Sequence, residues 1–140
     1  MENGLNSKEV GNLGEEIATG FLRKKGFRIL ARNYAKRMRF GPQLGEIDIV
    51  ACKKQWFWQA IFGPKEPVRF VEVKTLAGPV PSGFSPEQKV DANKRKKLEN
   101  MAQIWLSENR KFDTPWQIDI ISIIVDSRSG ESKIEYFENI

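Results

Sequence analysis

Two opposite charges interrupt the segment RFVEVKTL (69–76), whose β-branched and aromatic residues otherwise predict a buried strand. Because side chains alternate along a strand, Glu72 and Lys74 share one face, and Val68 and Phe70 precede them on that face. The charges therefore emerge from an apolar surface near the end of the strand. A carboxylate placed there needs a cation or a polar partner, because burying an unpaired charge is costly.

A second predicted strand, LGEIDIVAC (44–52), has a similar pattern. Glu46 and Asp48 are expected on one face of it, and Ile47 and Ile49 on the other. If the two strands are neighbours, Asp48 converges with the charged pair of the first segment. Two carboxylates so close together need a cation to offset them.

The converging charges have two interpretations. In one, Asp48 and Glu72 hold a divalent metal such as Mg²⁺ or Mn²⁺, and Lys74 orients an attacking water or stabilises developing charge. In the other, Lys74 forms a cross-strand salt bridge with one of the carboxylates on a half-exposed sheet face. The spacing of these residues leaves both interpretations open.

The composition excludes several classes of site. The chain contains no histidine, which rules out histidine general bases, Ser-His-Asp triads and histidine-bound zinc. Its one cysteine, Cys52, can form neither an internal disulfide nor a zinc site built from several cysteines. Enzymatic chemistry would therefore depend on carboxylates, lysines, hydroxyls and an oxygen-bound metal.

The net charge of +5 suits a polyanionic partner such as nucleic acid. Much of the excess lies in ARNYAKRMR (31–39) and KVDANKRKK (89–97), although such runs are often only the solvated face of an element. The candidate phosphate contacts are Arg32, Lys36, Arg37, Arg39, Lys89, Lys94, Arg95, Lys96 and Lys97.

A helix is predicted over 7–25, with Ser7 as N-cap and Gly26 as the stop that follows its last turn. Its expected apolar face consists of Val10, Leu13, Ile17 and Phe21. Gly11 and Gly14 lie beside Glu15 at the border of this face, which is consistent with bare backbone lying close on a sheet. Glu15 is then either a site residue or an exposed acid favoured by the helix dipole.

The rest of the chain alternates strands with one further helix. SPEQ (85–88) predicts a helix start, with Ser85 as N-cap and Gln88 closing a capping box, and the helix should run to about Asn109. Its buried side is expected to hold Leu98, Met101, Ala102 and Trp105. The other predicted strands cover 27–34, 116–126 and 132–138.

This order of elements predicts one α/β (α+β) domain over 1–140, with a central mixed β-sheet flanked by helices. No apolar run approaches the eighteen or so residues of a membrane span, and the N-terminal residues lack the apolar core of a signal peptide. A cytoplasmic location without a membrane partner is the default expectation.

An aromatic-rich insertion occupies about 53–67, KKQWFWQAIFGPKEP, between two of the predicted strands. The simplest expectation is an extended hairpin that packs on its own domain. A dimer contact and an apolar wedge against a partner are the alternatives.

The segments GNLGEEIATGFLRKKGFRILARNY, GEIDIVA, FVEVKT and QIDIISI follow one another as in the YraN-like family, which the chain resembles over nearly its whole length except 53–67. This bacterial family is similar to the restriction-endonuclease-like nucleases and to archaeal Holliday-junction resolvases. The resemblance implies a nuclease core, a Mg²⁺-dependent endonuclease activity on DNA and a possible homodimer.

The resemblance also assigns roles to individual residues. It implies that Asp48, Glu72, Glu15 and the backbone carbonyl of Val73 bind the metal, and that Lys74 is the catalytic lysine. Glu46 and Gln88 would support the site, although capping explains Gln88 equally well.

This chain departs from the family at the insertion, where a tight turn is implied, and at Leu76, where the family has an arginine. One phosphate contact is thereby in doubt. The expected function is a metal-dependent endonuclease acting on DNA, with branched DNA as a candidate substrate. The alternatives are a nuclease-like module that binds nucleic acid without cutting it, and a structural partner that uses the insertion as its contact.

Overall fold

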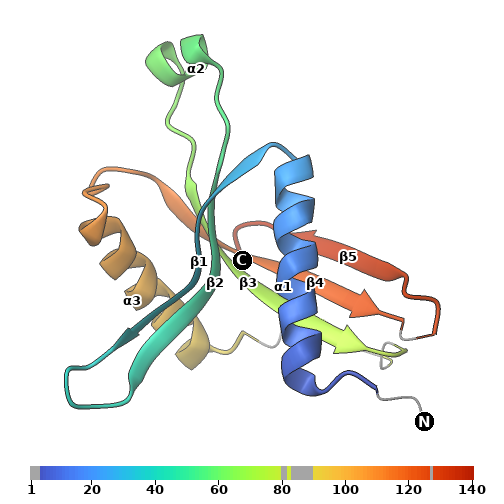
Figure 1. Ribbon diagram of the computed structural model, residues 1–140. Helices are drawn as coiled ribbons and strands as arrows, with labels where there is room; N and C mark the ends of the chain where they lie inside the picture. The colour runs from blue at the N-terminus through green and yellow to red at the C-terminus, as the bar shows by residue number, and fades with distance from the viewer. Residues whose placement is uncertain (1–3, 80–81, 83–89, 127) are drawn as a thin grey trace.

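The computed structural model describes residues 4–79, 82, 90–126 and 128–140, and these form one mixed β-sheet with a long helix on each face (Figure 1). The expected fold class, a central mixed sheet flanked by helices, is confirmed. The elements in chain order are α1 (Ser7–Lys24), β1 (Phe27–Arg37), β2 (Gln43–Lys53), α2 (Phe57–Phe62), β3 (Val68–Ala77), α3 (Ala92–Glu108), β4 (Trp116–Val125) and β5 (Ser132–Phe137).

The strands lie in the order β1-β2-β3-β4-β5. β3 and β4 are parallel, as their connection through α3 requires, and the other neighbours are antiparallel. β3 pairs with β4 over its whole length, from Val68↔Trp116 to Ala77↔Val125. Its pairing with β2 covers only three residue pairs and ends at Ile49↔Val71. The two strands thus separate just before Asp48 and Glu72.

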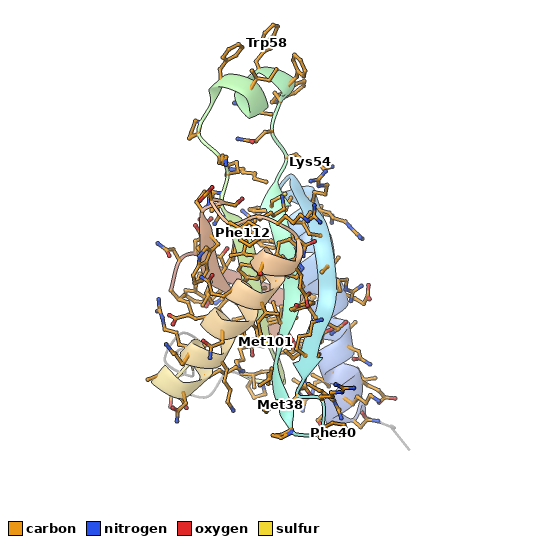
Figure 2. All side chains as sticks on the ribbon, turned by 90° about the vertical axis from the view of Figure 1, so that its left-hand side faces the viewer. Met38, Phe40, Lys54, Trp58, Met101 and Phe112 are labelled. Atoms are coloured by element: carbon orange, nitrogen blue, oxygen red, sulfur yellow. The ribbon has the colours of Figure 1, made fainter. Side chains whose placement is uncertain are left out.

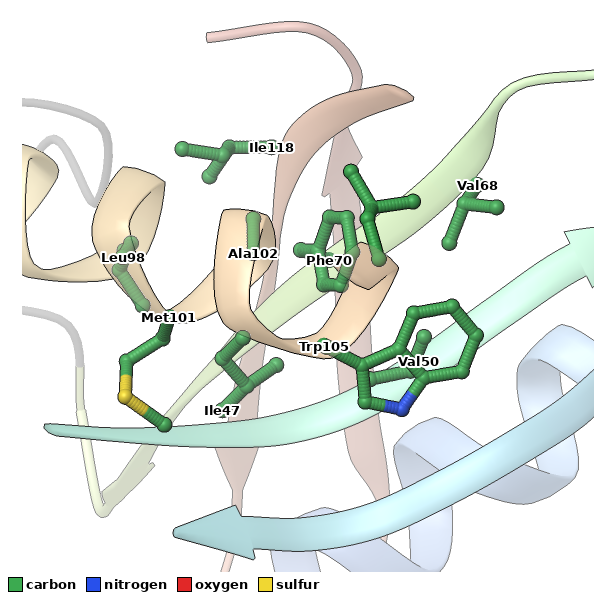
Figure 3. Close-up of a cluster of buried hydrophobic side chains, with 10 residues drawn as sticks. Ile47, Val50, Val68, Phe70, Leu98, Met101, Ala102, Trp105 and Ile118 are labelled. Carbon is green, nitrogen blue, oxygen red and sulfur yellow. The ribbon is translucent and has the colours of Figure 1, made fainter. Parts of the chain in front are cut away.

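Each face of the sheet has its own apolar core. On the α3 face, the expected residues Leu98, Met101, Ala102 and Trp105 are all buried, and they pack on side chains of β2 and β3 (Figure 3). The Phe70 and Trp105 rings meet edge to face, with centroids 5.8 Å apart. The core on the α1 face is built from aliphatic residues of β2, β3 and β4 together with Ala18 and Leu22.

The buried face of α1 differs from the predicted one. Val10 and Leu13 are not fully buried, and Ile17 and Phe21 lie only at the margin of the core. The buried residues are Gly14, Ala18, Thr19 and Leu22. The physical reason is the close approach of helix and sheet at Gly14, where a Cβ atom would lie 1.8 Å from Thr75 Oγ1. Small residues allow that approach, and a search for large apolar residues overlooks them.

α1 begins at Ser7, as the predicted range 7–25 does, but its N-cap lies one residue earlier than expected. Asn6, rather than Ser7, is the N-cap of α1, because its side chain and that of Glu9 form a reciprocal capping box. α3 begins at Ala92 with Asp91 as N-cap, so the single helix predicted from 85 to about 109 is interrupted at Val90 and Asp91. Ser85 and Gln88 lie outside the described residues. Gly26, with a φ of 86°, follows α1 as expected.

The 53–67 insertion does not pack on the domain, so the simplest expectation for it is wrong. It forms the short helix α2, which projects beyond the end of the sheet (Figure 1). None of the residues of α2 is buried. No helix in the described part of the chain combines the length and the hydropathy that a membrane crossing needs.

The two glycines of α1 provide a matched test of its packing. We expect Gly14→Ala to destabilise the protein by about 1–3 kcal/mol, because the added methyl group collides with Thr75. Gly11→Ala should instead stabilise it by about 1 kcal/mol, since no atom lies within 4 Å of a Cβ atom there and alanine favours the helix. Urea unfolding measures both changes. Equal effects at the two positions would contradict the close packing at Gly14.

Candidate functional site

Asp48 lies where β2 and β3 stop pairing. Its Oδ2 atom accepts a hydrogen bond of 2.7 Å from the backbone N–H of Val73. The Asp48 side chain thus takes the place that a backbone carbonyl of β2 would occupy in a continued ladder. The site carboxylate is thereby fixed to the strand that carries Glu72 and Lys74.

The expected alternation of β2 breaks at this point. Ile47 packs in the core on the α3 face, whereas Ile49 packs in the core on the α1 face, so their predicted shared face is wrong. Alternation holds only in a regular strand, and β2 has lost β3 as a partner here. On its other side, Asn33 of β1 adopts a left-handed φ of 48° between the pairs Arg32↔Ile49 and Tyr34↔Ile47.

Glu72 is buried, with 7% of its surface exposed, and two lysines share one of its oxygens. Lys74 Nζ lies 3.2 Å from Glu72 Oε1, and Lys94 of α3 forms an ion pair with the same oxygen. A Lys74–Glu72 salt bridge is therefore present, but it lies within β3 and on a buried carboxylate, whereas a cross-strand bridge on a half-exposed face was expected. Lys94 was expected only as a phosphate contact, and the structure places it on the site carboxylate.

The electrostatics of the site follow from burial and crowding. Burial first, then the negative charges of Glu72, Glu15 and Glu46, raise the pKa of Asp48 to about 7, although the Val73 hydrogen bond opposes this. Burial and the neighbouring Lys94 lower the pKa of Lys74.

For Lys94, burial acts to lower the pKa, but its bond to Glu72 outweighs this and raises it. The site therefore holds one carboxylate that ionises near neutral pH and two lysines that are shifted in opposite directions.

Glu15 and Glu46 lie at the edge of this group. Glu15 Oε2 accepts a hydrogen bond of 2.7 Å from Asn33 Nδ2, and its charge acts on Asp48 without direct contact. In the described part of the chain, no three acidic, histidine or cysteine side chains lie close enough together to hold a metal ion. The structure thus brings Asp48, Glu72 and Lys74 together and leaves the predicted third carboxylate apart.

A pocket of about 240 Å³ opens beside the two carboxylates. It is lined by Gly45, Glu46, Asp48, Glu72, Lys94, Lys97 and Leu98. Gly45 allows β2 to pack closely on α3 beside this pocket, because a Cβ atom at this position would lie 2.8 Å from the Met101 side chain. Acidic residues come from the sheet and basic ones from α3, so the pocket can accept both a cation and an anionic group.

The candidate phosphate contacts fall into two groups. Four of them already pair with acids: Lys94 with Glu72, Arg32 with Glu16 at 2.8 Å, Lys36 with Glu108 at 2.6 Å, and Arg95 with Glu99 at 3.1 Å. Among the described residues, no ion pair involves Arg37, Arg39, Lys96 or Lys97. Lys89 and the supporting candidate Gln88 lie outside the described residues.

The sequence analysis overlooked a second buried acid, Asp119 of β4. It is fully buried and pairs with Arg69 at 3.3 Å, while Tyr136, Gln117 and the backbone of Asn139 donate hydrogen bonds to it. These contacts connect β3 and β5 with the last residues of the chain, which indicates a structural role. The IDI pattern of β4 repeats that of β2 and was the available signal.

The raised pKa of Asp48 predicts a pH dependence of stability in metal-free buffer. An aspartate in an unfolded chain has a pKa near 4, so the native state binds more protons between about pH 4 and 7, and stability falls as pH rises through that window. We expect Asp48→Asn, measured by urea unfolding, to gain about 2 kcal/mol over the unmodified protein between about pH 5 and 8. A stability difference that does not change with pH would contradict the raised pKa.

Comparisons with known proteins agree with the resemblance found in the sequence. The family model described as uncharacterised protein family UPF0102 matches residues 14–123. A UPF0102 protein of Syntrophomonas wolfei is 35% identical over 95% of this chain and 97% of its own length. One of Dictyoglomus thermophilum is 35% identical over 91% of each chain. The matched region contains every element of the charged site, and the chain belongs to the UPF0102, or YraN, family.

Proposed function

We propose that this protein is a metal-dependent nuclease that hydrolyses phosphodiester bonds of DNA, with branched DNA as a candidate substrate. The observation that carries the proposal is the meeting of Asp48, Glu72 and the Val73 backbone at the point where β2 and β3 separate, with Lys74 beside them. The resemblance of the GEID and FVEVK segments to nucleases gives the same assignment.

The residues present suit a hard cation. Asp48 and Glu72 supply carboxylate oxygens. The N–H and C=O groups of one strand residue point toward the same neighbour, so the Val73 carbonyl is directed toward β2, as its N–H is. Mg²⁺ and Mn²⁺ prefer such oxygen donors together with water and phosphate oxygens. A bound metal would polarise the phosphodiester and lower the pKa of an attacking water.

The lysines of the site contribute positive charge and orientation. Lys74 has a lowered pKa, and its ammonium lies within hydrogen-bonding range of the carboxylate edge. From there it can orient a water or stabilise charge that develops on the phosphate. Lys97 lines the same pocket, and Lys96 extends the positive surface along α3. These cations would attract the DNA backbone without reading its sequence.

A second candidate, binding of nucleic acid without cleavage, has its own support. The pairing of Glu72 with both lysines balances the buried charge without any metal. A protein that has lost catalysis could retain this arrangement and the basic surface. The two functions differ in metal dependence and in product.

Cleavage assays on linear, nicked and four-way DNA with Mg²⁺ or Mn²⁺ separate these functions. We expect metal-dependent cutting of DNA. The cleavage rate should fall about a hundredfold or more in Glu72→Ala and in Lys74→Ala. The exposed pair Glu131→Ala and Lys133→Ala provides matched controls that should keep full activity. Salt-sensitive binding without cutting under either metal supports the second candidate. Neither cutting nor binding would refute both.

Lys94 competes with a metal for Glu72. A metal-binding measurement can test this competition without any measurement of DNA cleavage. We expect Lys94→Gln to raise the affinity for Mg²⁺ or Mn²⁺ about tenfold, or about 1.4 kcal/mol, because it removes a cation from the carboxylate oxygen. Metal titration followed by thermal unfolding measures the change. Lys96→Gln, on the same helix and exposed, is the control. Equal affinity in both variants would place the metal away from Glu72.

A further inference from the structure

The tip of the 53–67 insertion exposes a cluster of large apolar side chains. Between 52% and 83% of the surface of each is exposed, and the cluster, here called the aromatic tip, consists of Trp56, Phe57, Trp58, Ile61 and Phe62. Its rings contact one another, with Phe57–Trp58 and Trp58–Phe62 centroids 5.4 and 6.1 Å apart. An exposed apolar group of this size marks a binding surface.

The aromatic tip stands apart from the body of the protein. α2 projects past the ends of the strands in both views, and Trp58 lies at the apex, beyond Lys54 at the base (Figures 1 and 2). Gln55 Nε2 donates a hydrogen bond of 3.0 Å to the Pro64 carbonyl and so closes the neck of the projection. A partner can therefore cover the whole aromatic tip without any change in the position of the sheet.

Positive charge gathers in one surface hollow at the base of the projection, here called the basic hollow. The surface hollow at this end is lined by six basic residues and one acid, Glu66. The basic residues are Arg28, Lys53, Lys54, Lys65, Arg110 and Lys111. No ion pair in the described part of the chain involves any of them. Residues 55–64, which form the tip, carry no charge at all.

We propose that the aromatic tip and the basic hollow at its base dock this protein on an anionic lipid surface. Tryptophan and phenylalanine prefer the boundary between headgroups and acyl chains, where an amphipathic segment is held by its buried apolar area. Each lysine or arginine at the level of the headgroups adds attraction to anionic lipids. Apolar residues at the apex and cations one layer behind them match the order of layers in such a membrane.

Two other partners fit the tip less well. A second copy of the chain, docked tip to tip, would bring two basic hollows toward each other, and like charges oppose that contact. An apolar wedge in DNA enters a base step with few side chains, whereas five large side chains cluster here. A lipid surface accepts a cluster of any width.

Lipid docking and the candidate active site do not interfere with each other. The tip follows the end of β2 and precedes β3, whereas Asp48 lies five residues back from Lys53, or roughly 16 Å along the strand. The pocket beside Asp48 is lined by residues of β2, β3 and α3 and by none of the insertion. The lipid proposal does not depend on nuclease activity and can fail or hold independently of it.

Sedimentation with vesicles tests the proposal on the full chain. We expect binding to vesicles of phosphatidylcholine mixed with phosphatidylglycerol, little binding to phosphatidylcholine alone, and a blue shift of tryptophan fluorescence on binding. The double variant W58S/F62S should bind at least tenfold more weakly, and Lys54→Glu about tenfold more weakly. Unchanged thermal unfolding of these exposed variants shows that the fold is intact.

Matched controls come from the opposite end of the molecule. Phe40→Ser removes a ring that is 95% exposed, and Lys8→Glu reverses an exposed charge, and neither should alter vesicle binding. The proposal is wrong if the unmodified protein does not sediment with anionic vesicles. It is also wrong if W58S/F62S loses only DNA binding, which assigns the tip to nucleic acid, or only self-association, which assigns it to a second copy.

Discussion

The charged site depends on the separation of β2 from β3 after three residue pairs. Strands that stop pairing expose backbone groups that need new partners. Here the Asp48 side chain accepts the Val73 N–H, so one interaction repairs the ladder and holds a carboxylate in a half-buried place. On the opposite face of β3, the backbone of Gly14 rests on Thr75 and supports the same stretch of strand. The geometry of the site is thus set by β-sheet hydrogen bonding and by helix packing together.

Burying two carboxylates side by side has an electrostatic free-energy cost, which the protein reduces in two ways. Asp48 retains its proton up to about neutral pH, and Glu72 is balanced by Lys74 and Lys94. The second of these is the more informative, because Lys94 of α3 lines the same pocket as Glu72. Under the proposed function, a metal or an anionic substrate in this pocket would compete with that ion pair.

Much of this could be predicted from sequence, and the failures have physical reasons. Runs rich in β-branched and aromatic residues located all five strands, and the GEID and FVEVK segments identified Asp48, Glu72 and Lys74 as neighbours. The shared face of Ile47 and Ile49 was wrong because alternation assumes a regular strand. The face of α1 was wrong because a close contact selects small residues such as Gly14, which carry no hydropathy signal. Lys94 was missed as a site residue because its contact with Glu72 is tertiary.

The insertion exposes large apolar residues that would normally be buried, and its position in the chain explains how the fold tolerates it. Five large apolar residues usually indicate a core, but both faces of the sheet are already covered, by α1 and by α3. The insertion enters the chain at the end of the three-pair β2–β3 ladder that is opposite the charged site. Because each end of this short ladder releases the two strands, one end can form a pocket and the other a projection. Neither feature disturbs the pairing of β3 with β4, which holds the centre of the sheet together.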